Sequence, residues 1–129
     1  MSAGNLTFSQ LVLQVIDDSL SVLGDEPKKA IYQYLFTIHA LPKEDIPSRT
    51  DDFVSGMKKA LGTASTVIER LILKKLYQRI GSTFRESQGL EFGDYVEEAK
   101  RRFEVLKQHK GGLTGSLDFA ESKKGQSSS

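Results

Sequence analysis

The chain has 129 residues, a length that one hydrophobic core can serve, so a second independently folding domain is not expected. It contains no cysteine, which excludes disulfide bonds, thiolate nucleophiles and cysteine-ligated zinc. The formal net charge of +1 is too small for a general attraction to nucleic acid or anionic lipid, and 38% hydrophobic with 27% charged residues excludes the composition of a disordered protein.

Signals for export or membrane insertion are not evident in the sequence. No run approaches the roughly 20 apolar residues that a membrane span needs. The first apolar stretch is not preceded by a basic cluster. We therefore expect a cytoplasmic protein that does not enter a membrane.

The first two helices are predicted from apolar residues at three- and four-residue steps. The first runs from Phe8 to Leu23, and Gly24 provides its stop. The second begins at Asp25, which can cap it, with Pro27 in the first turn.

The second helix carries two apolar stripes. Its main stripe consists of Ile31, Tyr34, Leu35 and Ile38. The other stripe, Tyr32 and Phe36, predicts either burial on two sides or an exposed aromatic strip. We expect burial, and we keep the exposed strip as a candidate partner-binding surface.

Two prolines make residues 41–50 a connector with one helical turn, and Ile46 is expected to anchor it in the core. A short helix should run from Asp51 to Gly62, with its inward side formed by Phe53, Met57, Ala60 and Leu61. The fourth helix, capped by Thr63 or Ser65, should continue to Ile80 and end at Gly81. It is expected to be the central helix because apolar residues surround most of its circumference, namely Val67, Ile68, Leu71, Ile72, Leu73, Leu76, Tyr77 and Ile80.

A loop with a partial turn is expected over residues 82–93. The last helix should begin at Asp94, which forms a capping-box-like start with Glu97, and should end at Gly111-Gly112. Its apolar side consists of Tyr95, Val96, Ala99, Phe103 and Leu106. The sequence thus predicts an all-α protein, a compact bundle of about five helices around a central buried helix at about 64–80. Residues 1–110 form the single domain, and residues 111–129 form a disordered, flexible polar tail.

Three features suggest chemistry, and each has a plainer structural explanation. Residues 62–66 place glycine and hydroxyl groups at a helix start, which suits a phosphate but also suits ordinary helix capping. The pairs Asp17-Asp18 and Asp51-Asp52 could bind a divalent cation or act as acid and base, although neighbours on a helix point in different directions. His39 and His109 lie near helix ends, where a cation favours the helix dipole. We expect no catalytic site, metal or cofactor.

Basic residues are the better candidates for partner contacts. Residues 1–62 hold six Lys/Arg and eight Asp/Glu, whereas residues 63–110 hold ten and seven, so the second half is mildly basic. The candidate partner-binding residues on the fourth and last helices are Arg70, Lys74, Lys75, Arg79, Lys100, Arg101 and Arg102. They could contact phosphates or an acidic protein if they share one face, and otherwise they are solvated helix faces.

Residues 15–81 resemble the archaeal Nitrosopumilus output domain family, small helical modules that are attached to or accompany signalling and regulatory proteins. The matching features are Leu23-Gly24, Lys29-Ala30-Ile31-Tyr32 with Leu35, the Ile46-Pro47 connector, Phe53, Leu61-Gly62, and Ile68-Glu69 through Leu73, Leu76 and Tyr77. The resemblance implies a regulatory or output role without a catalytic motif. Residues 82–129 have no place in the family's pattern.

Three functional hypotheses follow. The leading one is a non-enzymatic regulatory or signalling output domain that binds protein, including a second copy of itself, through an apolar strip on the second or last helix. The alternative is a nucleic-acid-binding transcriptional regulator that uses the basic second half. An enzyme is third, and it requires a polar pocket containing Asp17, Asp18, His39 or Glu69.

Overall fold

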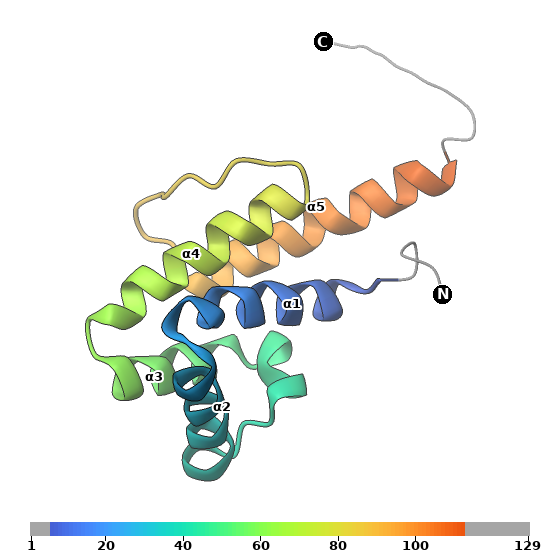
Figure 1. Ribbon diagram of the computed structural model, residues 1–129. Coiled ribbons are helices and arrows are strands. Elements are labelled where there is room, and N and C mark those ends of the chain that lie inside the picture. The colour runs from blue at the N-terminus through green and yellow to red at the C-terminus, as the bar shows by residue number, and fades with distance from the viewer. Residues whose placement is uncertain (1–5, 113–129) are drawn as a thin grey trace.

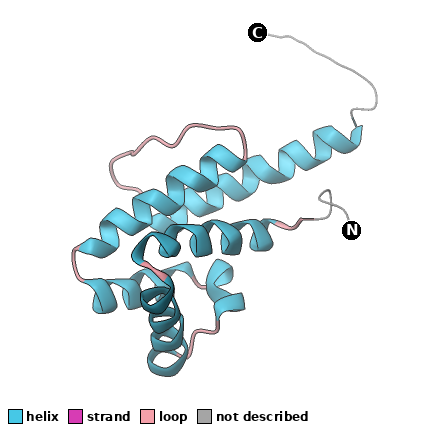
Figure 2. Cartoon of the chain, in the orientation of Figure 1, coloured by secondary structure: helices cyan, strands magenta, loops and turns pink. Residues whose placement is uncertain are grey.

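The computed structural model describes residues 6–112 of the chain, and the side chains of residues 6–107. Within this part every regular element is a helix, which confirms the all-α prediction (Figure 2). The elements are α1 (Phe8–Leu20), the short 3-10 helix η2 (Ser21–Leu23), α2 (Asp25–His39), the 3-10 helix η3 (Lys43–Ser48), α3 (Thr50–Leu61), α4 (Ala64–Arg79) and α5 (Phe92–Gly112). The tail predicted for residues 111–129 lies outside the described residues from 113 onward, and residues 111 and 112 belong to α5.

The helices pack on both sides of α1 (Figure 1). On one side lie α4 and α5, which run in the same direction, and on the other side lie α2 and α3. Because α4 and α5 are parallel, the segment between them, residues 80–91, must return along the length of α4. This return places a long loop beside the corner where α3, α4 and the beginning of α5 meet.

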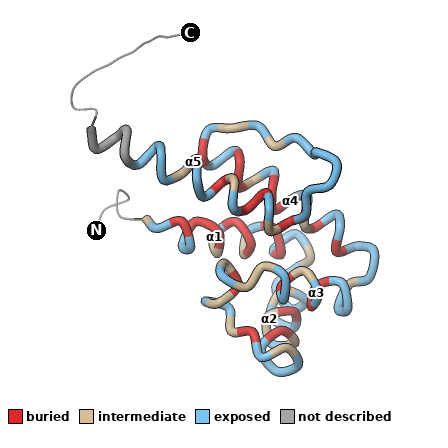
Figure 3. The backbone as a smooth tube through the Cα atoms, turned by 180° about the vertical axis from the view of Figure 1, so that it is seen from behind, coloured by how far each residue is buried: buried red, intermediate tan, exposed pale blue. Residues whose placement is uncertain are grey.

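The core is one continuous apolar cluster, to which α1 and α4 contribute many of the buried side chains (Figure 3). Helix α4 contacts α1, α3 and α5, as expected for a central helix. Its apolar surface is not completely covered, however, because Val67 is 64% exposed. The inward side predicted for α3 is also wrong at Ala60, which is exposed. Helix α1 is buried along its inner side, with Leu11, Val12, Val15, Ile16 and Leu20 at 0 to 1% exposure.

The burial expected for both stripes of α2 is wrong. Ile31 and Leu35 are buried, whereas Phe36 is 59% exposed and Ile38 is 63% exposed. The reason is that α2 contacts η2, η3 and α3, which cover one side of it and leave the other side to solvent. The predicted connector is confirmed, since it forms η3 and fully buries Ile46.

The helix ends differ from the predictions at several places. Helix α1 ends at Leu20, and residues Ser21–Leu23, predicted to belong to it, form η2. Asp25, predicted as a cap, is the first residue of α2 and makes no capping hydrogen bond. Helix α5 begins at Phe92, two residues before Asp94, because Phe92 is buried against Phe53 with ring centroids 5.9 Å apart. The Asp94 carboxylate instead accepts a hydrogen bond from the Glu91 amide at 2.8 Å. At the start of α4 no side chain caps the helix, and the amide of Ser65 donates to the Gly62 carbonyl at 3.1 Å.

Candidate functional site

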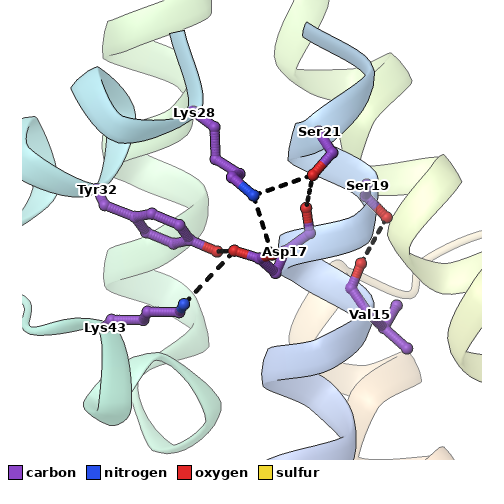
Figure 4. Close-up of polar contacts among 7 residues, drawn as sticks. All are labelled: Val15, Asp17, Ser19, Ser21, Lys28, Tyr32 and Lys43. Atoms are coloured by element: carbon purple, nitrogen blue, oxygen red, sulfur yellow. Dashed lines mark hydrogen bonds and ion pairs between the residues drawn. The ribbon is translucent and has the colours of Figure 1, made fainter. Parts of the chain in front are cut away.

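Asp17 lies at the centre of a polar cluster that joins α1, α2 and η3 (Figure 4). Its carboxylate accepts hydrogen bonds from Lys28 at 3.0 Å and from the Tyr32 hydroxyl at 3.0 Å, and Lys43 lies 3.4 Å away. Lys43 also lies over the Tyr32 ring, 4.7 Å from its centroid. Burial acts to raise the pKa of Asp17, but the hydrogen bonds and the two lysine charges outweigh it and lower the pKa.

The contacts of the Asp17 carboxylate disfavour both catalysis and cation binding at this residue. Both carboxylate oxygens already face ammonium groups, which a metal ion would have to displace. Asp18 is exposed and takes no part in the hydrogen bonds of this cluster, although it lines the same small hollow as Asp17 and Lys43. Tyr32, a candidate partner-binding residue, is half-buried with its hydroxyl bonded to Asp17, so only Phe36 remains exposed on that stripe.

Residues 82–91, which we call the strap, form the loop that returns from α4 to α5. Phe84 fixes the strap from within, because its ring packs against Tyr77 and Tyr95 at centroid distances of 5.7 and 5.0 Å. The Tyr95 hydroxyl accepts a hydrogen bond from the Ser87 amide at 2.8 Å and donates one to the Ser87 carbonyl at 3.0 Å. Arg70 of α4 pairs with Glu86 of the strap at 2.9 Å. The strap is therefore fixed by the ring contacts of Phe84, the hydrogen bonds of the Tyr95 hydroxyl and the Arg70–Glu86 ion pair.

Replacing Tyr95 by phenylalanine should lower the free energy of unfolding by about 1 kcal/mol, because two hydrogen bonds to Ser87 are lost while the ring remains. The amide of Ser87 should also exchange with deuterium faster than in the wild type. Urea unfolding and amide exchange measure the two effects. The control is Tyr34→Phe on α2, whose ring contacts His39 and which should change stability by less than about 0.5 kcal/mol. Unchanged exchange at Ser87 in Tyr95→Phe would contradict this view of the strap.

A cleft of about 900 Å³ opens between α3, α4, the strap and the beginning of α5. Its apolar wall consists of Val54, Leu73, Phe84, Leu90, Phe92 and Tyr95. Its charged residues are Asp51, Glu69, Glu86, Glu91 and Lys58, four carboxylates with one ammonium group. We call it the acidic cleft. A second cleft of about 830 Å³ on the strap's other side is lined by three arginines and three carboxylates, so its charges balance.

Glu69 is the most unusual residue of the acidic cleft. Its Oε2 atom is buried and has no hydrogen-bond partner among the described residues. Burial raises the pKa of the Glu69 carboxyl, and the positive charge of Lys58 opposes that rise only in part. The buried Oε2 atom of an ionised Glu69 is costly without a donor, and the described residues supply none.

Replacing Glu69 by glutamine should stabilise the free domain by about 1 kcal/mol near pH 7, because the variant removes a poorly solvated charge. A carboxyl whose pKa is raised in the folded state contributes stability at low pH and loses it as the pH rises through that pKa. The gain of Glu69→Gln should therefore vanish below about pH 4.3, the pKa of an unfolded glutamate. Urea unfolding at several pH values measures it. Glu104→Gln, an exposed position on α5, should show no such pH dependence.

The basic candidate residues already contact different parts of the chain. Arg70 pairs with the strap, whereas Arg79 donates to Gln14 of α1 at 3.0 Å. Arg101 and Arg102 both pair with Glu98 on their own helix, and Arg102 also reaches Ser82 at 3.0 Å. The remaining candidates are Lys74 and Lys100, which are exposed, and Lys75, which is half-buried.

The phosphate hypothesis for residues 62–66 finds little support in the geometry. The amides of Ser65 and Thr66 are already bonded to Gly62 and Thr63, and Ser65 itself is fully buried. Within residues 6–107, no three His, Asp or Glu side chains are grouped so that they could hold a metal ion. In the same part of the chain, no helix has the length and hydropathy to cross a membrane.

Of the four residues named for an enzymatic pocket, only Glu69 lines the acidic cleft. His39 lies in the last turn of α2, where its Nε2 atom is buried without a partner among the described residues. Sequence reasoning missed Asp51, Glu86 and Glu91 as neighbours of Glu69. These carboxylates come together because of the path of the strap, and no periodic pattern in the sequence predicts that path.

Comparisons of the chain with models of protein families, with curated proteins and with solved structures find no match. The resemblance to the Nitrosopumilus output domain family therefore stays a prediction from sequence.

Proposed function

We propose that the chain is a non-enzymatic regulatory domain that binds another protein, and that the partner contacts the acidic cleft. The observation that carries the proposal is the open cleft of about 900 Å³, which contains a buried Glu69 oxygen without a donor among the described residues. Binding sites are concave, largely apolar surfaces with a few polar groups that fix the ligand's orientation. The acidic cleft has this composition.

The chemistry of the cleft favours binding over catalysis. A carboxylate acts as a general base beside a nucleophile or a histidine, and His39 belongs to the crossing of α2 with α3, outside the residues that line the cleft. The cleft's hydroxyl groups are those of Ser55, Thr66, Ser87 and Tyr95. The Tyr95 hydroxyl is already used in the strap. The apolar wall supplies surface that a partner side chain would bury.

Site-directed photo-crosslinking in native extract tests the proposal. A benzophenone side chain is placed at Ser55 in the cleft, at Thr37 beside the exposed Phe36 of α2, and at Ser9 on α1, outside both surfaces. All three positions are exposed, so the substitutions should leave the fold intact. We expect one reproducible protein product from Ser55 and none from Ser9. A product from Thr37 alone would assign partner binding to the α2 strip and would overturn the proposal for the cleft.

Nucleic-acid binding is the second candidate, and the exposed Lys74 and Lys100 are the observation in its favour. Three arginines of the basic set are already engaged: Arg70 and Arg102 contact the strap residues Glu86 and Ser82, and Arg79 contacts Gln14 of α1. Gel shifts at low and moderate salt test it, because phosphate contacts weaken steeply as salt rises. Strong, salt-sensitive retardation that Lys74→Gln with Lys100→Gln abolishes would favour this candidate over protein binding.

A further inference from the structure

We propose that the partner segment seated in the acidic cleft is a basic peptide, and that one of its arginine or lysine side chains lies against Glu69 between the aromatic side chains of the wall. This inference rests on the proposed function, because it takes the cleft as the contact surface. It adds the chemical identity of the bound segment.

The charges of the cleft are not balanced. Glu86 forms an ion pair with Arg70. The three other carboxylates of the lining belong to Asp51, Glu69 and Glu91. Among the lining residues, Lys58 is the one lysine or arginine. The three carboxylates come from α3, α4 and the end of the strap, so the folding of the chain collects like charges around one space. A cation placed between these carboxylates would be attracted by all three.

The wall of the cleft suits a side chain that is both apolar and cationic. Phe84, Phe92 and Tyr95 line the same space as Glu69. Phe84 is half-buried, and an aromatic face attracts a guanidinium or ammonium group, whereas Phe92 and Tyr95 are buried and contribute apolar surface. Lysine and arginine also carry methylene stems that can bury apolar surface against residues such as Leu73 and Val54. Arginine fits best, because its planar group stacks on a ring while it donates to a carboxylate.

The size of the cleft favours a peptide over an isolated cation. A space of about 900 Å³ is far larger than a single ion or amine requires. A hydrated ion would not remove the apolar wall from water. In a peptide, the side chains next to a basic residue could cover that wall and bury its apolar surface. An extended segment of a few residues matches both features.

Binding of a cation should lower the pKa of Glu69. The charged and titratable groups around this carboxyl are Lys58 and Asp51 of α3, Arg70 of α4, Glu86 and Glu91 of the strap, and Tyr95 of α5. Burial raises the pKa of Glu69, and an arriving cation lowers it, so the ionised form binds more tightly. Affinity should rise with pH as Glu69 deprotonates, and this rise should be absent from the Glu69→Gln variant.

The test uses the full chain and capped peptides of alternating leucine and arginine, with citrulline in place of arginine as the neutral isostere, in calorimetric titrations. We expect the arginine peptide to bind at least about tenfold more tightly than the citrulline peptide, and Glu69→Gln to remove that tenfold advantage. Glu104→Gln removes an exposed charge from α5 outside the cleft and should bind like the wild type.

Equal binding of the arginine and citrulline peptides would overturn the inference, as would an arginine preference that survives in Glu69→Gln. Spermidine that competes as well as the arginine peptide would also overturn it, because the site would then select a free amine. These results are distinguishable from failure of the proposed function. If the partner crosslinks to Ser55 but the arginine preference is absent, the cleft is the contact surface and only the basic chemistry is wrong.

Discussion

Replacing Phe53 by alanine is expected to lower the free energy of unfolding by about 3–5 kcal/mol. Phe53 is the largest fully buried side chain of the domain, at 0% exposure, and its ring lies 5.9 Å from that of Phe92. The loss combines the transfer of the ring to water with the cavity that rigid neighbours leave behind. Urea unfolding followed by circular dichroism measures it. Because Phe92 lines the acidic cleft and begins α5, the same variant should also weaken binding at the cleft.

Phe36→Ala is the matched control for this prediction. It removes the same side chain from a position that is 59% exposed, so the change in stability should be within about 0.5 kcal/mol. A loss at Phe36 as large as that at Phe53 would show that the second stripe of α2 is buried in solution, against the structure. A small loss at Phe53 would mean that α3 and α5 do not meet there.

Replacing Gly56 by valine should cost about 3 kcal/mol, the upper part of the range for overpacked cores. Gly56 is where α3 crosses α2, and a Cβ atom there would overlap Leu35 Cδ2 and lie 3.3 Å from His39 Cδ2. Leu35 is itself fully buried, so it has little room to move. The helix propensity of valine exceeds that of glycine by a few tenths of a kcal/mol, roughly, which is too little to offset the overlap.

Ala60→Val on the same helix provides the comparison, since Ala60 is exposed. This variant should change the free energy of unfolding by less than about 0.5 kcal/mol. Thermal unfolding of the two valine variants under one set of conditions measures the difference. Equal stability of both variants would contradict the close crossing of α2 and α3.

Much of the fold could be predicted from the sequence because helical periodicity is a local signal. The steps between Leu11, Val15 and Ile16 define α1 without knowledge of any partner helix, whereas Gly24 ends the short helix η2 that follows α1. Periodicity does not say which apolar side finds a neighbour. Phe36 and Ile38 belong to good helical stripes, yet no helix covers them, so their exposure depends on the packing of the whole chain.

The candidate site was less predictable for the same physical reason. Glu69 stands in an apolar helix, and its sequence neighbours do not reveal that Asp51, Glu86 and Glu91 share its cleft. Their meeting depends on α4 and α5 being parallel, which forces the strap back across the beginning of α4. The sequence places Phe92 in a loop because Gly89 and Gly93 surround it, whereas in the structure Phe92 is a core residue beside Phe53 and begins α5.

The central claim is that the acidic cleft is the surface through which the domain binds its partner. The most direct test is the yield of crosslinked partner from Ser55 in the cleft compared with the yield from Thr37 on α2. We predict that the product forms from Ser55, is absent from Thr37, and decreases when an excess of arginine peptide is added. A product that forms from Thr37 and is absent from Ser55 would contradict the claim.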